Sequence, residues 1–231
     1  GLVAAITAKS NYPEKNVMVI RKEEKVMIPC GIPYIFGTLE SSESNILPDG
    51  GLINAGVNIK VDTVTNINLG NHFLETKDGS SITYEKLIIA TGSQPYIPDF
   101  ISGTNLENVF IVPKNKEYLD FFLNKLKGLK KVAVIGAGFI GVELSDELNK
   151  IDKDVSLIEF KPHILGEAFD EDTSIIAESL LKERGVNILT NKEVVAIKGT
   201  DKVKSILFSN GETMDVDAVV LAIGYTPNIE L

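Results

Sequence analysis

Three glycines in the stretch VAVIGAGFIG have the spacing needed to bind a phosphate-linked cofactor. Gly136, Gly138 and Gly141 form the pattern G-x-G-x-x-G, between a strand-like run and a segment with helical periodicity. In this context the first glycine permits a tight turn, the second lets the backbone approach a pyrophosphate, and the third brings the helix close to the sheet. The helix N-terminus adds partial positive charge. We therefore expect a dinucleotide site here.

An acidic residue follows at the distance that a dinucleotide site requires. Glu159 ends the next strand-like run, DVSLIEF, 23 residues after Gly136 (159 − 136). A carboxylate about 20 residues after the first glycine binds a ribose 2′-hydroxyl and repels a 2′-phosphate. NADH is therefore favoured over NADPH, and the nearby Lys161 weakens this preference.

The other residue with distinctive chemistry is Cys30, the only cysteine of the chain. It lies between Pro29 and Pro33, which restrict the backbone. One cysteine cannot form an internal disulfide, which suits a reducing cytosol. The residues alone leave two interpretations open, because a free cysteine is either an inert core residue or a reactive thiol.

The elements that must position these residues alternate between strands and helices. We expect helices over residues 1–10, 115–128, 139–151 and 170–185, and a short helical turn after Cys30. Antiparallel hairpin strands are expected over residues 57–69 and 72–90, around the turn DGSS. Other strands are expected over residues 16–20, 86–95, 131–135, 154–160, 186–190, 204–209 and 217–224, with residues 86–95 buried and stopping at Gly92 and Pro95.

The composition excludes several classes of function. The 231 residues carry a net charge of −9, which disfavours binding to nucleic acid or to an anionic membrane surface. No apolar run is long enough to cross a bilayer. His72 and His163 stand alone without partners at metal-ligand spacing, so we expect no metal site.

The start of the chain echoes the glycine-rich unit. GLVAAITAKS is similar to GVELSDELNK after Gly141, and NVMVI is similar to DVSLI. Gly1 would then be the third glycine of a second dinucleotide-binding unit. Arg21 stands where that unit would place an acidic ribose ligand, so Glu23 or the backbone would have to make the contact.

Four motifs in order, CGIPY, LIIATGSQP, VAVIGAGFIGVEL and VVLAIGYTPN, resemble those of the FAD-dependent pyridine nucleotide-disulfide oxidoreductases. The single-cysteine branch, which includes coenzyme A-disulfide reductases and NADH oxidases, is the most similar. The resemblance implies an α/β fold with two Rossmann-like dinucleotide-binding domains in three layers (ββα). Residues 1–112 would form a partial FAD-binding domain and residues 113–231 the NAD(H)-binding domain. It also implies a fragment that lacks an opening strand, a later FAD-binding segment and a dimerisation domain, so we expect a homodimer only for the full-length enzyme.

The resemblance implies that hydride passes from NADH through FAD to Cys30, which then reduces a disulfide, persulfide or polysulfide. Cys30 would lie at the start of the helix GIPYIF, whose N-terminus would stabilise the thiolate. Lys9 would contact an anionic thiol substrate such as coenzyme A, although a lysine at such a position is commonly only solvated. The residues expected to bind the cofactors are Gly1, Arg21, Lys22, Pro29, Thr91, Gly92, Gly136, Gly138, Phe139, Ile140, Gly141, Glu143, Glu159 and Gly224.

Other functions remain open at this stage. A related enzyme would reduce oxygen or peroxide instead of a disulfide. A non-catalytic NAD(H)-binding module would use Cys30 as a redox sensor, and an enzyme that passes electrons to a partner protein would not need Cys30. A cytoplasmic location is expected for all of these, and the fragment alone is expected to be inactive if it does not hold FAD.

Overall fold

The computed structural model describes residues 1–231, which divide into two compact units interleaved in sequence. Unit 1 comprises residues 1–26, 46–93 and 227–231, and unit 2 comprises residues 27–45 and 94–226. The predicted domains meet at residues 112 and 113, whereas unit 2 also takes in residues 94–112 and the stretch Met27–Asn45 around Cys30. We call Met27–Asn45 the Cys30 segment. The glycine-rich turn and the single cysteine therefore belong to one compact unit.

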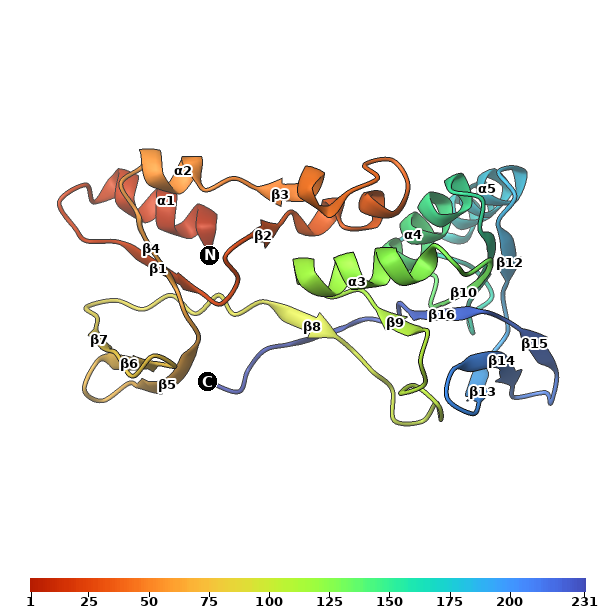
Figure 1. Cartoon of the computed structure of the whole chain (residues 1–231). Helices are drawn as coiled ribbons and strands as arrows, with labels where there is room; N and C mark the ends of the chain where they lie inside the picture. The colour runs from red at the N-terminus through yellow and green to blue at the C-terminus, as the bar shows by residue number, and fades with distance from the viewer. The chain divides into compact units, whose positions relative to one another are not determined.

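A five-stranded parallel sheet forms the centre of unit 2 (Figure 1). Its order is β12-β11-β10-β16-β9. Strands of a parallel sheet are buried on both faces and read as continuous apolar runs, as KVAVI and AVVL do. The strands are β9 (Val109–Ile111), β10 (Lys131–Ile135), β11 (Asp154–Ile158), β12 (Asn187–Leu189) and β16 (Ala218–Leu221).

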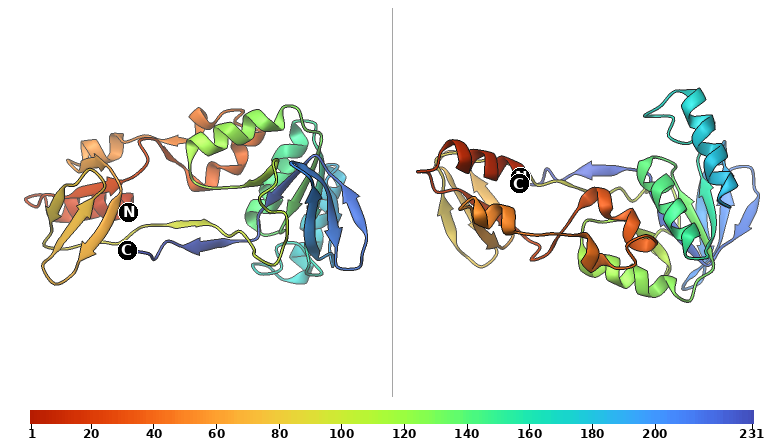
Figure 2. Two further views of the ribbon diagram at one scale, coloured as in Figure 1. Left: turned by 60° about the horizontal axis from the view of Figure 1, so that its bottom comes forward. Right: turned by 90° about the horizontal axis from the view of Figure 1, so that it is seen from above.

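Unit 2 has three layers, with helices on one face of the sheet and a second, antiparallel sheet on the other (Figure 2). The helices are α3 (Lys116–Leu126), α4 (Phe139–Lys150) and α5 (Glu171–Glu183). The second sheet consists of β13 (Val194–Gly199), β14 (Val203–Phe208) and β15 (Thr213–Asp215). Ile135 and Leu221 of the parallel sheet share one buried core with Ile206, while Leu144 and Leu148 of α4 are fully buried. This is the predicted Rossmann-like arrangement.

The ends of the helices in unit 2 follow from local side chains. The Asn115 side chain accepts a hydrogen bond from Tyr118 N at 2.9 Å and begins α3, and Asp170 begins α5 in the same way with Thr173 N. Gly185 follows α5 with φ of +103°, which glycine adopts readily. Strands β13 and β15 were not predicted, and α4 ends at Lys150, one residue before the predicted end at Ile151.

Unit 1 combines a small parallel pair with an antiparallel sheet. Its α1 (Leu2–Asn11) and α2 (Gly50–Asn54) pack with β1 (Met18–Arg21) and β4 (Asn58–Val61) around Ala5, Leu52 and Val57. The antiparallel sheet contains β5 (Val64–Asn68), β6 (Phe73–Thr76) and β7 (Ser81–Thr83), with the turn DGSS between β6 and β7 as predicted. Strand β4 was expected in an antiparallel hairpin but pairs in parallel with β1. Alternation of polar and apolar residues predicts a strand but does not identify its partner.

The prediction of a buried strand over residues 86–95 is wrong. Ile88 and Ile89 are 63% and 59% exposed, and only β8 (Ser93–Pro95) is a strand. An apolar run forms a buried strand only where neighbouring strands pair with its backbone, and no strand of this chain pairs with residues 86–92.

The remaining elements are β2 (Val26–Met27), β3 (Ile46–Leu47), β17 (Tyr225–Pro227) and the 3₁₀ turns η1 (Pro29–Gly31), η2 (Pro33–Phe36) and η3 (Ser42–Asn45). None of the helices has the length and apolar character needed to cross a membrane.

Candidate functional site

The glycine-rich turn of unit 2 has the geometry of a phosphate cradle. It joins the end of β10 to α4, and Gly136 has φ of +99°. A Cβ on Gly136 would lie 2.6 Å from the Ala222 carbonyl oxygen, and one on Gly141 would overlap the Gly136 carbonyl oxygen. A Cβ on Gly138 would have no atom within 4 Å. The first and third glycines are thus required by the fold, whereas the second leaves open space before the N-terminus of α4, which fits a pyrophosphate.

Glu159 lies beside this turn, as its spacing predicted. Its side chain is buried, with Oε2 accepting from Ala137 N at 2.8 Å and Oε1 accepting from Lys161 N at 3.0 Å. These bonds hold the carboxylate at the carboxyl end of β11, the edge where parallel sheets bind ligands. The Lys161 ammonium forms an ion pair with Glu167. The Lys161 ammonium is therefore paired with Glu167 and not with the Glu159 carboxylate.

Two exposed aromatic rings border the glycine-rich turn. Phe139 begins α4 and is 54% exposed, and its ring meets that of Phe169 edge to face, with the centroids 5.8 Å apart. The loop that carries Phe169 is held to the turn by Leu165 N, which donates to Ala137 O at 2.8 Å. Phe139 was among the predicted residues but Phe169 was not, since no local pattern links a loop phenylalanine to a turn thirty residues earlier. Exposed rings here offer an apolar surface to a planar base.

Three other predicted residues of unit 2 lie close to the glycine-rich turn. Two of them are in α4, directly after the turn, and the third follows β16, which pairs with β10. Ile140 is half-buried in the first turn of α4. Burial raises the pKa of the Glu143 carboxyl, one turn further along, and the Glu147 carboxylate raises it further. Gly224 follows β16 with φ of +118°, and its carbonyl accepts from Tyr96 N at 2.9 Å. These positions surround the carboxyl ends of β10 and β16.

Cys30 is exposed and lies within the 3₁₀ turn η1, next to the exposed Pro29. Asn45 holds this turn in place through two hydrogen bonds. Its side-chain Nδ2 donates to Ile28 O at 2.9 Å, and its backbone carbonyl oxygen accepts from Ile28 N at 2.9 Å. Gly31 packs against the Asn45 side chain so closely that a Cβ there would overlap it. The exposure of Cys30 argues against an inert core thiol. Sequence reasoning missed Asn45, which carries no local signal.

One expectation for Cys30 needs correction. The sulfur was expected at the start of a helix spanning residues 31–36, whose dipole would stabilise the thiolate. The segment instead forms two 3₁₀ turns, η1 and η2, each begun by a proline. Because a 3₁₀ turn of three or four residues aligns few peptide dipoles, the helix dipole does not account for thiolate stabilisation here.

The predicted residues of unit 1 make contacts of their own. Thr91 Oγ1 donates to Asn228 O at 2.6 Å, and Asn228 returns bonds from its side chain to Thr91 O and from its backbone to Gly92 O. This joins two sequence motifs that are 137 residues apart. Gly92 has φ of +73° with open space around its Cα, so the turn fits close approach of a flat ring. Gly1 is exposed and caps α1 without a side chain.

The basic residues of unit 1 are engaged mainly with the protein. Arg21 forms two hydrogen bonds with Asp49, at 2.5 and 2.6 Å. The Lys9 ammonium donates to the carbonyls of Pro13 and Lys15. Lys22 is exposed and lies 3.5 Å from Glu23. These contacts favour structural roles for Arg21 and Lys9 over contacts with a ribose or a thiol substrate, which stay predictions.

Known proteins resemble this chain over its whole length. Residues 1–231 match the family model described as pyridine nucleotide-disulphide oxidoreductase. The chain is 32% identical to an NADH oxidase of Methanocaldococcus jannaschii, over 100% of this chain and 53% of that protein. It is 31% identical to the CoA-dependent NAD(P)H sulfur oxidoreductase of Pyrococcus abyssi, over 100% of this chain and 52% of that protein.

A solved structure, that of a NAD-dependent persulfide reductase from A. fulgidus, matches with a TM-score of 0.87 and 25% identity, covering 99% of this chain and 44% of that one. The chain spans about half the length of the curated relatives it matches. The family uses FAD and NAD(P)H. With its glycine-rich cradle, the adjoining Glu159 and an exposed cysteine, the chain belongs to the pyridine nucleotide-disulphide oxidoreductase family.

Proposed function

We propose that this chain is the nucleotide- and cysteine-bearing part of an enzyme that uses NADH to reduce a disulfide, persulfide or polysulfide through Cys30. The observation that carries the proposal is the exposed thiol of Cys30, held by Asn45 in the same compact unit as the dinucleotide cradle. A structural cysteine needs neither exposure nor a fixed turn around it.

The chemistry assigned to Cys30 is thiol-disulfide exchange. The Cys30 thiolate attacks one sulfur of the substrate disulfide and displaces the other as a thiolate, which forms a mixed disulfide. FAD, when bound, supplies the two-electron relay between a nicotinamide and this sulfur. An electron pair originating from NADH then returns Cys30 to the thiolate and releases the second thiol. The sum is NADH, one proton and a disulfide giving NAD⁺ and two thiols.

The residues of unit 2 support a preference for NADH. Gly138 leaves room for the pyrophosphate at the N-terminus of α4. Glu159, whose two oxygens are held by backbone N–H groups, accepts a ribose hydroxyl and repels a 2′-phosphate. We therefore propose NADH as the preferred donor.

The test is a visible absorption spectrum of the purified protein, recorded before and after anaerobic addition of NADH. A flavin band that bleaches with NADH supports the proposal. NADH-dependent reduction of a disulfide such as coenzyme A disulfide is then measured in the parent and in Cys30→Ser. Loss of this reduction in Cys30→Ser, with bleaching retained, supports the role of Cys30, whereas full activity of Cys30→Ser refutes it.

Reduction of oxygen or peroxide is a second candidate, favoured by the 32% identity to an NADH oxidase. It predicts NADH consumption that depends on oxygen without any disulfide. A redox-sensing module would bind NAD(H) without flavin, and electron transfer to a partner protein would survive Cys30→Ser. We also propose a homodimer for the full-length enzyme, and a cytoplasmic location, which a chain with a single cysteine suits.

A further inference from the structure

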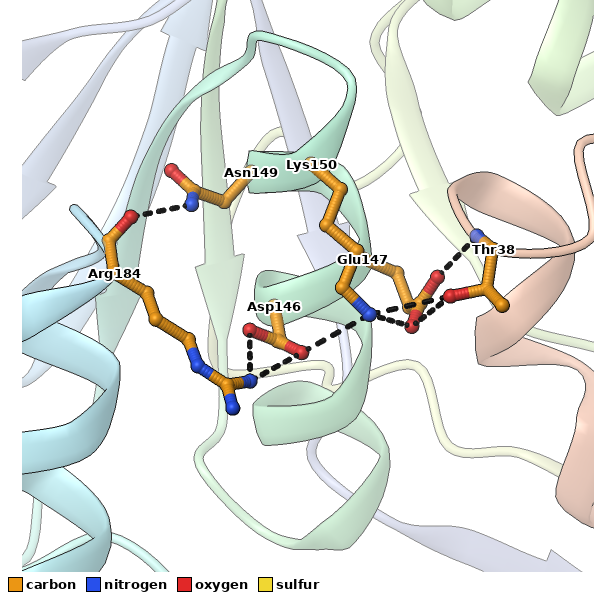
Figure 3. A network of polar contacts seen from close by, with 6 residues as sticks. All are labelled: Thr38, Asp146, Glu147, Asn149, Lys150 and Arg184. Carbon is orange, nitrogen blue, oxygen red and sulfur yellow. Dashed lines mark hydrogen bonds and ion pairs between the residues drawn. The ribbon is translucent and has the colours of Figure 1, made fainter.

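A carboxylate of unit 2 that sequence analysis did not single out ties the Cys30 segment to the nucleotide-binding helix. Glu147 lies in α4 and is only 1% exposed. Its Oε2 accepts from Thr38 N at 2.5 Å and its Oε1 accepts from the Thr38 hydroxyl at 2.9 Å, as Figure 3 shows. The Lys150 ammonium donates to Oε1 at 2.6 Å and to the Thr38 hydroxyl at 3.2 Å.

The backbone of the Cys30 segment packs closely against α4 beside this network. A Cβ on Gly37 would lie 2.5 Å from the Glu147 carbonyl oxygen and 2.6 Å from its Oε2. Only glycine therefore lets the Cys30 segment come this close to α4. A buried carboxylate is costly unless its charge is paired and hydrogen-bonded, and here both oxygens are used by one short stretch of the Cys30 segment and by Lys150.

The rest of the Cys30 segment is held to α3 of the same unit. The ring of Phe36 packs against Phe122, with the centroids 4.7 Å apart. Ser42 is hydrogen-bonded to Asp120, and Lys116 lies 2.8 Å from Glu43. The contacts to α3 are therefore apolar or partly exposed. Helix α4 packs against η2 and adds a buried, charged contact, in which Glu147 binds both the backbone N–H and the hydroxyl of Thr38, beside Lys150.

We infer that Glu147 is a positioning residue for Cys30, coupling the helix that begins at the dinucleotide cradle to the segment that carries the thiol. The inference rests on the proposed function, because it assigns Glu147 a role in presenting a redox cysteine. Glu147 does not touch Cys30 or a substrate. It acts by fixing Gly37 and Thr38, seven and eight residues after Cys30, onto α4 (37 − 30 and 38 − 30).

The experiment uses four variants of the full chain: Glu147→Gln, Thr38→Val, the double variant and Asp146→Asn as the matched control. Glu147→Gln keeps the side-chain volume and removes the charge. Thr38→Val replaces the hydroxyl with a methyl group of similar size. Asp146 is the preceding residue of α4. Its carboxylate pairs with Arg184 at 2.9 Å and with the Lys150 ammonium at 3.3 Å, but it makes no bond to Thr38 (Figure 3). Asp146→Asn therefore removes a carboxylate beside Lys150 and leaves the bonds between Glu147 and Thr38 in place. Thermal unfolding is measured for every variant.

Two readouts are compared. Amide hydrogen exchange of peptides covering residues 30–45 reports the mobility of the Cys30 segment without any cofactor. Steady-state reduction of a disulfide by the flavin-loaded enzyme reports kcat and KM for NADH. We expect faster exchange in Glu147→Gln and Thr38→Val. We also expect kcat to fall by about 10- to 100-fold, with KM for NADH unchanged within about twofold, because a misplacement of about 1 Å costs about this much.

Coupling is tested by the double variant, whose effect should equal that of Glu147→Gln alone, since both single changes break one network. Asp146→Asn should match the parent in exchange and kcat. If exchange and kcat in Glu147→Gln match the parent while Cys30→Ser is inactive, the inference is wrong and the proposed function stands.

If Cys30→Ser retains full activity, the proposed function fails and the positioning role fails with it. If Glu147→Gln does not fold, Thr38→Val decides. This variant keeps the backbone bond to Glu147, so we expect it to fold, but it loses the hydroxyl bond to the buried carboxylate. Parent-like values in Thr38→Val would then overturn the inference.

Discussion

Alanine at the second glycine of the cradle should strongly weaken dinucleotide binding without harming the fold. Gly138 has φ of −74°, which any residue adopts, and its Cβ would meet no atom within 4 Å. As an N-cap, alanine destabilises the helix by about 0.5–1 kcal/mol relative to glycine. Alanine also stabilises the protein by about 0.4–1 kcal/mol, because it lowers the conformational entropy of the unfolded chain. The two effects offset each other, so the free energy of unfolding of Gly138→Ala should stay within about 1 kcal/mol of the parent.

Alanine at the third glycine should have the opposite effect. A Cβ on Gly141 would overlap the Gly136 carbonyl oxygen, which is backbone and can yield only if α4 moves away from β10. Overpacking of this kind costs about 1–3 kcal/mol or more, and the gain in helix propensity of about 1 kcal/mol recovers only part of it. Gly141→Ala should therefore lose up to about 2 kcal/mol of stability, or more if α4 cannot move.

For Gly138→Ala and Gly141→Ala, the free energy of unfolding is measured in urea and the affinity for NADH by calorimetric titration. In Gly138→Ala the added methyl group occupies the space reserved for the pyrophosphate, and we expect affinity for NADH to fall by about 100-fold, or about 2.7 kcal/mol. The reasoning is refuted if Gly138→Ala binds NADH as the parent does, or if it unfolds more readily than Gly141→Ala.

Three further predictions concern charged groups. Burial raises the pKa of Glu143, so its ionisation opposes folding and stability falls as the pH rises through that pKa. Glu143→Gln should raise the free energy of unfolding near pH 7 by less than about 1 kcal/mol, because the group is partly exposed, with no gain near pH 3 in urea melts. Hydrogen bonds from the backbone, including Lys131 N at 2.8 Å, lower the pKa of Asp217. This contributes stability above the ordinary pKa of an aspartate that is lost on acidification. Asp217→Asn should cost about 1–2 kcal/mol near pH 7 and flatten the acid limb of a pH series of thermal melts; an unchanged acid limb would contradict this. Asp49→Ala should cost about 1–3 kcal/mol, since it leaves the Arg21 guanidinium, 11% exposed, without its carboxylate. The flavin content of the purified protein should not change in Asp49→Ala, and a loss of flavin would count against a purely structural role.

The parts of the fold that could be predicted from the sequence are those whose requirements are local. The cradle is predictable because its three glycines have a fixed spacing, and because the strand before it and the helix after it carry clear periodicities. The N-caps Asn115 and Asp170 bond to residues three positions later. Glu159 follows from a spacing that the strand-helix-strand unit fixes.

What the sequence did not predict depends on partners far along the chain. The apolar run at Ile88 and Ile89 has the composition of a buried strand, but burial requires neighbouring strands, which a periodicity does not supply. The attachment of the Cys30 segment to α4 joins Thr38 and Glu147, 109 residues apart. A single glutamate in an amphipathic helix reads as a solvated residue, and only the packed structure shows that it is buried.

The same separation has a consequence for synthesis of the chain. At about 5–20 residues per second, roughly 5–20 s pass between translation of Thr38 and of Glu147. For most of that interval Ile35 and Phe36, which are almost completely buried in the finished fold, have neither α3 nor α4 to cover them, because α3 begins at Lys116 and α4 at Phe139. Compact domains usually fold as units once they are complete, but here the first piece of unit 2 precedes most of unit 1 on the ribosome. The Cys30 segment is therefore the stretch that we expect chaperones to protect during translation.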